Sequence, residues 1–461
     1  MRVRPVSGPS TENIYIMNKY GQRYRWSDLS AQAQAEVMQR PVVAASANTL
    51  TSAREIIAAV RDEGDTALRR LSVEFDKAEI ENFRVSDTEF TNARAALTDE
   101  QFIAIQTAIR NVRCYHEAQQ TEPYTVTTAD GVVCERIVRP VQAVGLYVPA
   151  GTAPLPSTAI MLAVPASIAG CITKILCTPP RPDGSADPAV LTAARECGIT
   201  DIYKIGGAQA IAAMAYGTSS VPKIDKIFGP GNAWVTAAKT EVAADPAGAA
   251  MDMPAGPSEV LVIADDSADP RAVALDLLSQ AEHGVDSQVI LLTDSIELAD
   301  AADAEIAAAL AELSRREIMV QSLNHSRTIL VDSIAEALDV SNLYAPEHLI
   351  IQTRDARSWL KNVSNAGSIF LGAYTPEAVG DYCSGTNHVL PTYGYARAYS
   401  GLSVQDFQKR MSVQELTADG LRGLQPTVST LARMEGLDAH ARAVEVRIER
   451  LDEKNSTEAE S

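Results

Sequence analysis

Four of the six histidines in this chain lie in polar strings beside turns, where side chains that do chemistry are often placed. They are His283 in SQAEHG, His348 in YAPEHL, His388 in SGTNH and His440 in GLDAH. Gln280 and His283 occupy the predicted last turn of a helix, and their spacing puts both side chains on one face. An imidazole and an amide oxygen on one face form half of a small metal site. A polar helix end without any ligand explains the pair equally well.

Glu347 and His348 follow Pro346 and precede the apolar run LIIQ. A carboxylate and an imidazole at one site could divide two proton transfers between them, each worth about 10²–10⁴-fold in rate. Adjacent residues of an extended segment point to opposite sides, so this role requires a turn after Pro346. The alternative is a surface glutamate beside a half-buried histidine.

Asp381 and His388 lie in EAVGDYCSGTNHVLP, whose Gly, Ser, Thr, Asn and Pro residues predict a loop. Loops mounted between rigid elements often carry function, although an ordinary turn explains either residue alone. Glu435 and His440 form a pair that spacing does not support, because they do not share a helix face and Gly436 can end the helix.

Three strand-to-helix turns suit an anionic cofactor: VPAGTAPLPST at 148–158, IGGAQA at 205–210 and FGPGNA at 228–233. Glycine lets the backbone approach a ligand closely, and free amides at a helix N-terminus attract phosphate. Asn232 is a predicted N-cap. Plain βα turns also need glycine, but these three share one predicted lobe, at the strand ends where open α/β sheets bind ligands. No dinucleotide-binding glycine fingerprint with a downstream acidic residue is present.

The composition limits the possible partners and compartments. The 461 residues predict two or three domains, and 46% hydrophobic with only 5% aromatic residues is typical of helix-flanked parallel sheets. A net charge of −19 argues against a nucleic-acid or anionic-membrane partner. No unbroken apolar run is long enough to span a membrane, and the first residues lack the apolar region of a secretory signal. The cysteines form no CxxC pair, which favours reduced, buried thiols in a cytosol.

Hydrophobic periodicity predicts helices over 52–76 and 87–120. From Ala143, short β-rich runs alternate with helices (GLYV, KILC, DIYKI, KIDKIF), and a second such series follows AAMDMPAGP (EVLVIAD, QVILLTD, RTILVD, SIFLG). This pattern predicts an α/β fold with two Rossmann-like parallel-sheet lobes. We expect an N-terminal extension, partly disordered, over 1–30, a helical segment contributing to the first lobe over 31–142, the cofactor-binding lobe over 143–250, the second lobe over 251–394, and a small helical C-terminal piece with a frayed tail over 395–461.

Taken in order, these strings resemble the histidinol dehydrogenase family. The resemblance runs roughly from Arg40 to Arg450, through GLYVPAGTAPLPST, IGGAQAIAAMAYGT, IDKIFGPGNAWVTAAK, DMPAGPSEVLVIAD, DLLSQAEHGVDSQVILLT, YAPEHLIIQT, GDYCSGTNHVLPTYG and DFQKRMSVQELT. It implies a cytoplasmic homodimer of interlocked subunits that oxidises L-histidinol to L-histidine through the aldehyde. Two NAD⁺ would be consumed as co-substrates, and each site would hold one Zn²⁺. One departure is Ala150, where the family usually has glycine.

The resemblance also implies roles for individual residues. The zinc ligands would be Gln280, His283, Asp381 and His440, the last reaching the partner's site. The acid/base pair would be Glu347 and His348. Ser258, His388 and Glu435 would contact the substrate, together with His348 and the four zinc ligands. Tyr147, Gln209 and Asn232 would contact NAD⁺.

On this hypothesis, His348 takes the hydroxyl proton in the first hydride transfer, and Glu347 activates water on the aldehyde. Zinc has no accessible second oxidation state, so the nicotinamide must carry the redox chemistry while the metal grips substrate nitrogens. Three alternatives remain: a relative of the same family acting on another alcohol, a zinc hydrolase that needs no NAD⁺, and a binding protein without catalysis.

Overall fold

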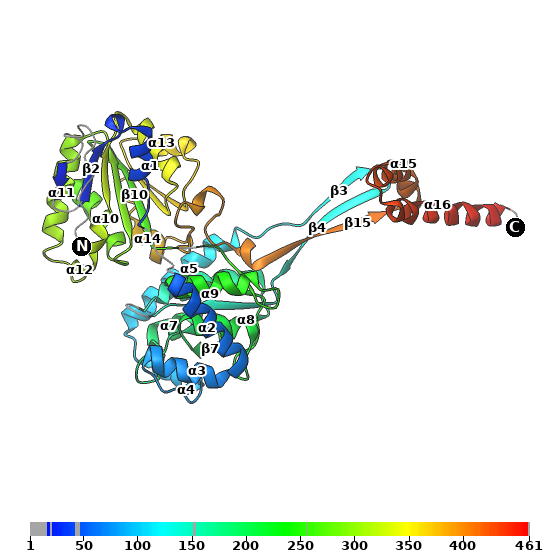
Figure 1. The fold of residues 1–461 in the computed structure, drawn as a ribbon, viewed down its shortest axis with the longest axis horizontal. Coiled ribbons are helices and arrows are strands. Elements are labelled where there is room, and N and C mark those ends of the chain that lie inside the picture. The colour runs from blue at the N-terminus through cyan, green and yellow to red at the C-terminus, as the bar shows by residue number, and fades with distance from the viewer. Residues whose placement is uncertain (1–15, 19–20, 42–46, 151–153, 255, 460–461) are drawn as a thin grey trace. The chain divides into compact units, whose positions relative to one another are not determined.

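The computed structural model describes residues 16–18, 21–41, 47–150, 154–254 and 256–459. The chain forms two compact units, the first from Met1–Ala118 with Gln142–Val404 and the second from Gln119–Val141 with Gln405–Ser461. The first unit contains two α/β lobes, each built around its own sheet (Figure 1).

The sheet of the first lobe has five parallel strands in the order β7-β6-β5-β8-β9. Its strands are β5 (Ala143–Tyr147), β6 (Thr173–Thr178), β7 (Asp201–Lys204), β8 (Lys226–Phe228) and β9 (Ala250–Met251). The helices between them are α6 (Pro156–Ala169), α7 (Pro188–Glu196), α8 (Gly207–Tyr216) and α9 (Ala233–Ala244). The chain moves outward from β5 in one direction and then from β8 in the other. The strand order therefore reverses between β5 and β8, where open α/β sheets bind ligands.

The N-terminal helices cover this lobe, as predicted, but each predicted helix is divided. They are α2 (Ala47–Glu63), α3 (Asp65–Leu71), the π-helical turn η2 (Ser72–Asp76), α4 (Asp87–Ala95) and α5 (Asp99–Glu117). Gly64, with φ of 58°, separates α2 from α3. Capping boxes begin α4 at Ser86 and α5 at Thr98. Because α2 packs on α8 and α5 packs on α6, the inner helices α8 and α6 are almost completely apolar.

The sheet of the second lobe has seven strands in the order β1-β2-β12-β11-β10-β13-β14. Its strands are β1 (Ile16–Asn18), β2 (Gly21–Arg25), β10 (Glu259–Ala264), β11 (Gln288–Thr293), β12 (Arg327–Leu330), β13 (His348–Gln352) and β14 (Ser368–Leu371). Its helices are α1 (Ala31–Val37), α10 (Pro270–Ala281), α11 (Ile296–Ala309), α12 (Arg316–Leu323), α13 (Ile334–Tyr344) and α14 (Glu377–Tyr382). Short 3₁₀ turns are η1 (Trp26–Asp28), η3 (Ala356–Asn362), η4 (Tyr395–Arg397) and η5 (Val404–Phe407). From β10 to β14 the strand order repeats that of the first lobe, which confirms two Rossmann-like lobes.

One strand of this sheet differs from the expected division. Strand β2 pairs in parallel with β12, so residues 21–25 belong to the second lobe and not to an extension. Tyr24 and the following Trp26 are buried there, a signal too short for periodicity to detect. Strand β13 lies between β10 and β14, and its sequence HLIIQ is buried at every position.

The second unit contains an antiparallel sheet in the order β15-β4-β3 and two helices. They are β3 (Tyr124–Ala129), β4 (Val132–Pro140), β15 (Gln408–Leu416), α15 (Ala418–Met434) and α16 (Asp438–Ala459). The prediction that 395–461 is helical is therefore wrong over β15, and the helical prediction for 31–142 is wrong over β3 and β4. Most of β15 is exposed, so its sequence lacks the alternation of a half-buried strand. Its pairing with the distant β4 determines its structure.

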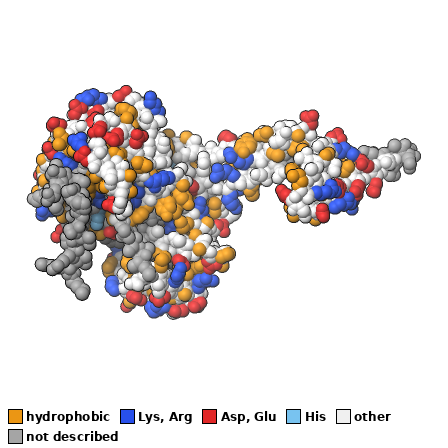
Figure 2. Space-filling view, turned by 45° about the horizontal axis from the view of Figure 1, so that its top comes forward, with side chains coloured by type: hydrophobic (Ala, Val, Ile, Leu, Met, Phe, Trp, Pro, Cys, Tyr) orange, Lys and Arg blue, Asp and Glu red, His pale blue; other side chains and the backbone are white. Residues whose placement is uncertain are grey.

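Three features bear on the predictions made from the composition: membrane-spanning helices, surface charge and the state of the cysteines. Among the described residues, no helix combines the length and apolar character needed to cross a bilayer. On the face drawn in Figure 2, acidic and basic side chains are intermingled over the described residues. All six cysteines are free thiols, of which Cys171, Cys177 and Cys197 are buried and Cys114 is exposed.

Candidate active site

The predicted chemical residues of the second lobe gather at the amino edge of its sheet. Strand β10 begins at Glu259 and its parallel neighbour β13 begins at His348. Helix α10 runs back from the carboxyl edge, so its last turn, with Gln280, returns to the same amino edge. The topology alone therefore brings Gln280 and His348 together, and their side-chain nitrogens lie 3.5 Å apart.

His348 is the centre of this group and is buried. Its Nδ1 lies 3.1 Å from the carbonyl oxygen of Glu259 and 3.6 Å from Oε2 of Glu347. Its Nε2 lies 3.5 Å from Oδ1 of Asp381. Burial alone would lower the pKa of His348, but the carboxyl groups of Glu347, Glu377 and Asp381 outweigh it and raise that pKa well above 6.5. The three carboxyl groups therefore favour the protonated form of His348 in the protein alone.

Glu347 is buried beside His348, and its Oε2 accepts a hydrogen bond of 2.8 Å from the backbone N–H of Glu259. The expected turn lies before Pro346 and not after it, because Ala345 has φ of 56°. Strand β13 then starts only at His348. Glu347 therefore lies outside the extended segment, and adjacent side chains need not point to opposite sides there. The side chains of Glu347 and His348 lie side by side.

Three further side chains form a group that could hold a metal ion. One ligand atom from each of His283, Glu377 and Asp381 lies within 4.8 Å of the others. Burial would raise the pKa of Asp381, but contact with His348 and the nearby His388 and His283 lowers it. Histidine and carboxylate oxygen are ligands that zinc accepts.

Glu377 was not predicted from the sequence. It is buried, and its pKa is raised well above 4.5, first by burial and then by Asp381 and Glu347, against the opposing effect of His348. Residues 377–382 form helix α14, where a loop was expected. On a helix, Glu377 and Asp381 share one face, and this spacing is the signal that could have identified Glu377.

Gly380 allows α14 to approach the sheet closely. A Cβ at this position would lie 2.6 Å from Cε1 of Phe370. The Phe370 ring in turn packs on His348, with 5.9 Å between ring centroids. The glycine before Asp381 is therefore required by packing beside the site.

His283 follows α10 instead of ending it. The helix ends at Ala281, Glu282 is its C-cap, and the N–H of His283 bonds to the carbonyl of Gln280 at 3.2 Å. The expectation that His283 lies in the last helical turn is thus wrong by two residues, although the tight turn keeps it beside the group. The His283 side chain is exposed, but desolvation by the surrounding protein lowers its pKa, opposed by Asp381 and Glu347.

The Gln280 side-chain amide has two possible orientations. With Nε2 toward Glu377, at 3.2 Å from Oε2, its oxygen accepts from the N–H of Glu259 at 3.1 Å. In the other orientation Nε2 lies 3.4 Å from Oε2 of Glu347, and the amide oxygen faces the carboxyl group of Glu377. The first orientation satisfies the protein alone, whereas the second places two acceptor oxygens face to face.

His388 links the metal group to the first lobe. Its Nδ1 lies 2.8 Å from the carbonyl oxygen of Asp381, and its Nε2 lies 3.2 Å from the hydroxyl of Thr158 on α6. Both ring nitrogens are thus held by protein. Ser258 immediately precedes Glu259 at the start of β10, and its carbonyl accepts from the N–H of Gln288 at 3.2 Å.

Two predicted residues lie in the second unit. Glu435 is the C-cap of α15, and His440 lies in the first turn of α16. Both are exposed, and Gly436, with φ of 71°, separates the two helices. The structure of each unit by itself does not bring them to the other site residues.

The predicted NAD⁺ residues lie at the carboxyl edge of the first sheet. Tyr147 ends β5, and its hydroxyl accepts a 3.0 Å hydrogen bond from the N–H of Gly207. Gln209 is in the first turn of α8. Asn232 is the N-cap of α9, and its side chain accepts from Trp234 and Val235, as predicted. Residues 151–153 of the first glycine-bearing turn lie outside the described residues.

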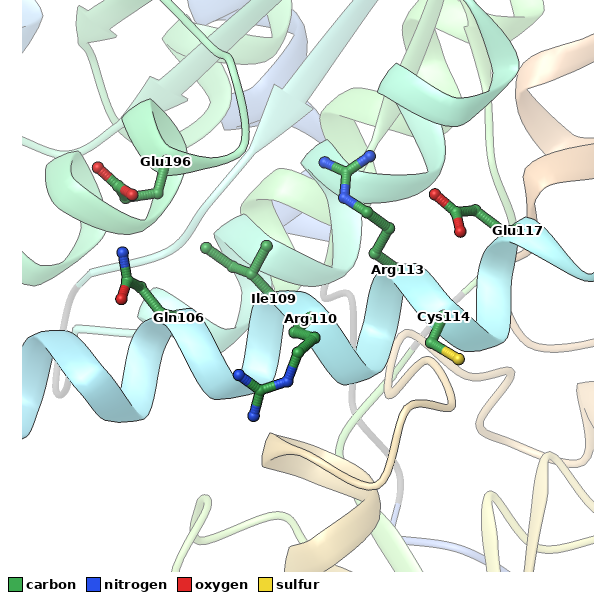
Figure 3. Close-up of a pocket in the computed structure, with 7 residues that line it drawn as sticks. All are labelled: Gln106, Ile109, Arg110, Arg113, Cys114, Glu117 and Glu196. Carbon is green, nitrogen blue, oxygen red and sulfur yellow. The ribbon is translucent and has the colours of Figure 1, made fainter.

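One surface pocket of about 540 Å³ lies elsewhere. It is lined by side chains of α5 between Gln106 and Glu117 and by Glu196 of α7 (Figure 3). Arg113 and Ile109 lie on the side of α5 toward Glu196. None of the predicted site residues lines it.

Fold and site together define a two-lobed Rossmann-like α/β protein with a buried histidine–carboxylate group. The family model of histidinol dehydrogenase matches residues 39–448. The chain is 57% identical over 423 residues to histidinol dehydrogenase from Xanthomonas oryzae pv. oryzae, covering 92% of this chain and 98% of that protein. It is 54% identical over 435 residues to the one from Photobacterium profundum, covering 94% and 97%. The crystal structure of histidinol dehydrogenase from Elizabethkingia anophelis matches with a TM-score of 0.90 at 44% identity, over 95% of this chain and 99% of that chain. This chain belongs to the histidinol dehydrogenase family.

Proposed function

We propose that this protein oxidises L-histidinol to L-histidine through the aldehyde, consuming two NAD⁺. Family membership supports this assignment, and the observation that carries it is the buried His348 between Glu347 and Asp381. Oxidation of an alcohol to an acid at one site requires removal of the hydroxyl proton and addition of water to the aldehyde, and two proton-transfer groups can divide these steps. His348 and Glu347 supply these two groups.

A zinc ion would be held by His283 and Asp381, two members of the group that also contains Glu377, together with Gln280. The donors are an amide oxygen, an imidazole and a carboxylate, all of which zinc accepts. The second orientation of the Gln280 amide sets its oxygen against the Glu377 carboxyl group, acceptor against acceptor, which a cation would resolve. When bound, the ion would coordinate the substrate nitrogens. We further propose His440 of the partner subunit as the remaining imidazole ligand.

His348 can act as a base only when it is neutral. The neighbouring carboxyl groups raise its pKa in the protein alone and so favour the protonated form. Compensation of their charge by a cation among Gln280, His283 and Asp381 would lower the pKa of His348 toward the working pH. Glu347 is held by the Glu259 N–H and would direct water onto the aldehyde.

The first lobe would bind NAD⁺ at the carboxyl edge of its sheet. Tyr147, Gln209 and Asn232 lie on three different turns of that edge, and two of those turns begin helices whose first amides can receive phosphate. Ser258 and His388, and Glu435 from the partner subunit, would contact the substrate. His388 would have to exchange its bond to Thr158 for one to the substrate.

We also propose an interlocked homodimer in the cytoplasm. The exposed apolar side chains of Leu431, Met434 and Leu437 beside His440 support an interface there. The free cysteines agree with a reducing compartment.

The decisive experiment is NADH formation with L-histidinol, with and without a chelator and with zinc added back. We expect histidinol-dependent NADH that the chelator abolishes and zinc restores. A panel of other amino alcohols and polyols would test the substrate. Absence of NADH under every metal condition would refute the proposal.

A further inference from the structure

Asp76 is a carboxyl group beside the predicted cofactor turn that no sequence motif identified. It is the last residue of η2, and its Oδ2 lies 3.3 Å from Nε2 of Gln209. Its Oδ1 lies 3.1 Å from the place where a Cβ on Gly206 would stand. Burial raises the pKa of Asp76 to about 6, and only the Gln209 amide acts against that rise. The group is therefore a half-buried acid, and no cation among the described residues contributes to the shift of its pKa.

The place of Asp76 in the fold matches a recurrent ligand position. In dinucleotide-binding sheets, an acid at the end of the strand beside the central strand binds the ribose hydroxyls. Here the central strand is β5 and that neighbour is β6, which ends at Thr178 and continues into Pro179 without an acid. The Pro179 ring lies 2.8 Å from the same Cβ position of Gly206 that Asp76 flanks. Asp76 thus stands at the end of β6, supplied by an upstream segment.

Asp76 also belongs to the group of predicted NAD⁺ contacts. It bonds to Gln209, and its charge contributes to raising the pKa of Tyr147, after the larger effect of burial. The Tyr147 hydroxyl holds the N–H of Gly207, the residue after Gly206. One small region therefore contains the start of α8, Tyr147, Gln209 and a carboxyl group.

We propose that Asp76 is a specificity-determining residue that accepts hydrogen bonds from the adenosine ribose of NAD⁺ and excludes the 2′-phosphate of NADP⁺. A carboxylate is a strong acceptor for two vicinal hydroxyls, and its charge repels a phosphate placed there. The first basic residue after β6, Arg181, forms an ion pair with Asp187, the N-cap of α7. The inference rests on the proposed function only in placing the dinucleotide on the first lobe.

The test is equilibrium binding of NAD⁺ and NADP⁺ by calorimetry to the whole protein and to Asp76→Asn. Asparagine keeps an acceptor for Gln209 but removes the charge. We expect NAD⁺ affinity to fall about 10-fold, the usual effect of losing a hydrogen bond to a charged group. NADP⁺ affinity should rise, so that the preference for NAD⁺ falls about 10- to 100-fold. Glu74→Gln is the matched control, an exposed acid on the same turn, and should leave both affinities unchanged.

If the preference for NAD⁺ over NADP⁺ in Asp76→Asn stays at the wild-type value, the proposal is overturned. Asp76 would then only hold the Gln209 side chain in place. Asp76→Glu provides a second variant if Asp76→Asn does not fold. It keeps the charge, so the exclusion of NADP⁺ should persist while NAD⁺ binds more weakly; loss of the exclusion would contradict the role of the charge. Because binding is measured without turnover, an altered preference without any histidinol oxidation would refute the proposed function alone.

Discussion

Nε2 of His348 lies 3.5 Å from Oδ1 of Asp381, so the predicted base touches a predicted metal ligand. The contact joins β13 to α14, two elements that different parts of the chain supply. The proton-transfer group and the metal group therefore form one electrostatic unit, in which a change at either residue alters the pKa of the other.

Asp381→Asn should reduce zinc affinity at least 10-fold, because it replaces the proposed ionised ligand by a neutral one. Competition with a chromophoric chelator measures this without turnover. Asp286→Asn removes the same charge from an exposed acid three residues after His283 and should have no effect. Equal affinities for the two variants would exclude Asp381 as a ligand.

Glu347→Gln should stop the reaction at the aldehyde. In the proposed mechanism the first hydride transfer needs His348 and the second needs water activated by Glu347, so the second step should slow by about 10²–10⁴-fold. The yield should fall from two NADH per histidinol toward one, and the aldehyde should be trapped by a hydrazine reagent. Full conversion to histidine would show that another group activates water.

The sequence could predict the two lobes because each βα unit carries its own periodicity and turn residues. It could not predict β15, whose exposed side chains carry no alternation and whose pairing with β4 depends on residues far away in the chain. For the same reason β2, with the buried Tyr24, was expected to be part of an extension.

The site was predictable mainly through family resemblance. Spacing identified Gln280 with His283 but set Glu347 and His348 on opposite sides of an extended segment. The left-handed conformation of Ala345, with φ of 56°, turns the chain there. Alanine rarely adopts this conformation, so the sequence does not indicate the turn. Asp76 was missed because the acid comes from before the sheet and not from the end of β6.

Asp276→Asn should make the protein more stable at alkaline pH. Burial raises the pKa of Asp276 to about 7, opposed by the bond from Gln352. A carboxyl group with a raised pKa contributes its full stabilisation to the free energy of unfolding below about pH 4. That contribution is lost as the pH rises through 7. Between pH 5.5 and 8 the wild type should lose about 2 kcal/mol through this group. Urea unfolding of both proteins at fixed concentration with chelator would measure the difference, and parallel pH profiles would contradict it.

Lys239→Met should loosen the turn after β8. Lys239 donates to the carbonyl of Gly229 at 2.9 Å and pairs with Asp252, whose Oδ2 accepts from the Gly229 N–H at 2.8 Å. Removing one partner leaves a buried charge and should destabilise the fold by about 3–5 kcal/mol. NAD⁺ affinity should fall as well, because Asn232 follows this turn.

The double variant Lys239→Met with Asp252→Asn removes both charges and should recover part of the lost stability. Denaturation of the wild type, Lys239→Met, Asp252→Asn and the double variant gives the coupling free energy. Additive losses would show that the two side chains stabilise the turn independently.

His283→Ala and His440→Ala subunits should complement each other if His440 reaches the partner's site. Each homodimer would be inactive, since every site lacks one ligand. In the heterodimer one site carries both substitutions and the other carries neither. With random pairing after co-expression, half of the dimers are heterodimers, and each has one complete site of two. The mixture should therefore regain about a quarter of the wild-type activity, with one zinc bound per heterodimer. If both ligands came from one subunit, every site in the mixture would still lack a histidine and no activity would return. Size-exclusion chromatography of the doubly tagged heterodimer excludes the trivial explanation that the two subunits do not associate.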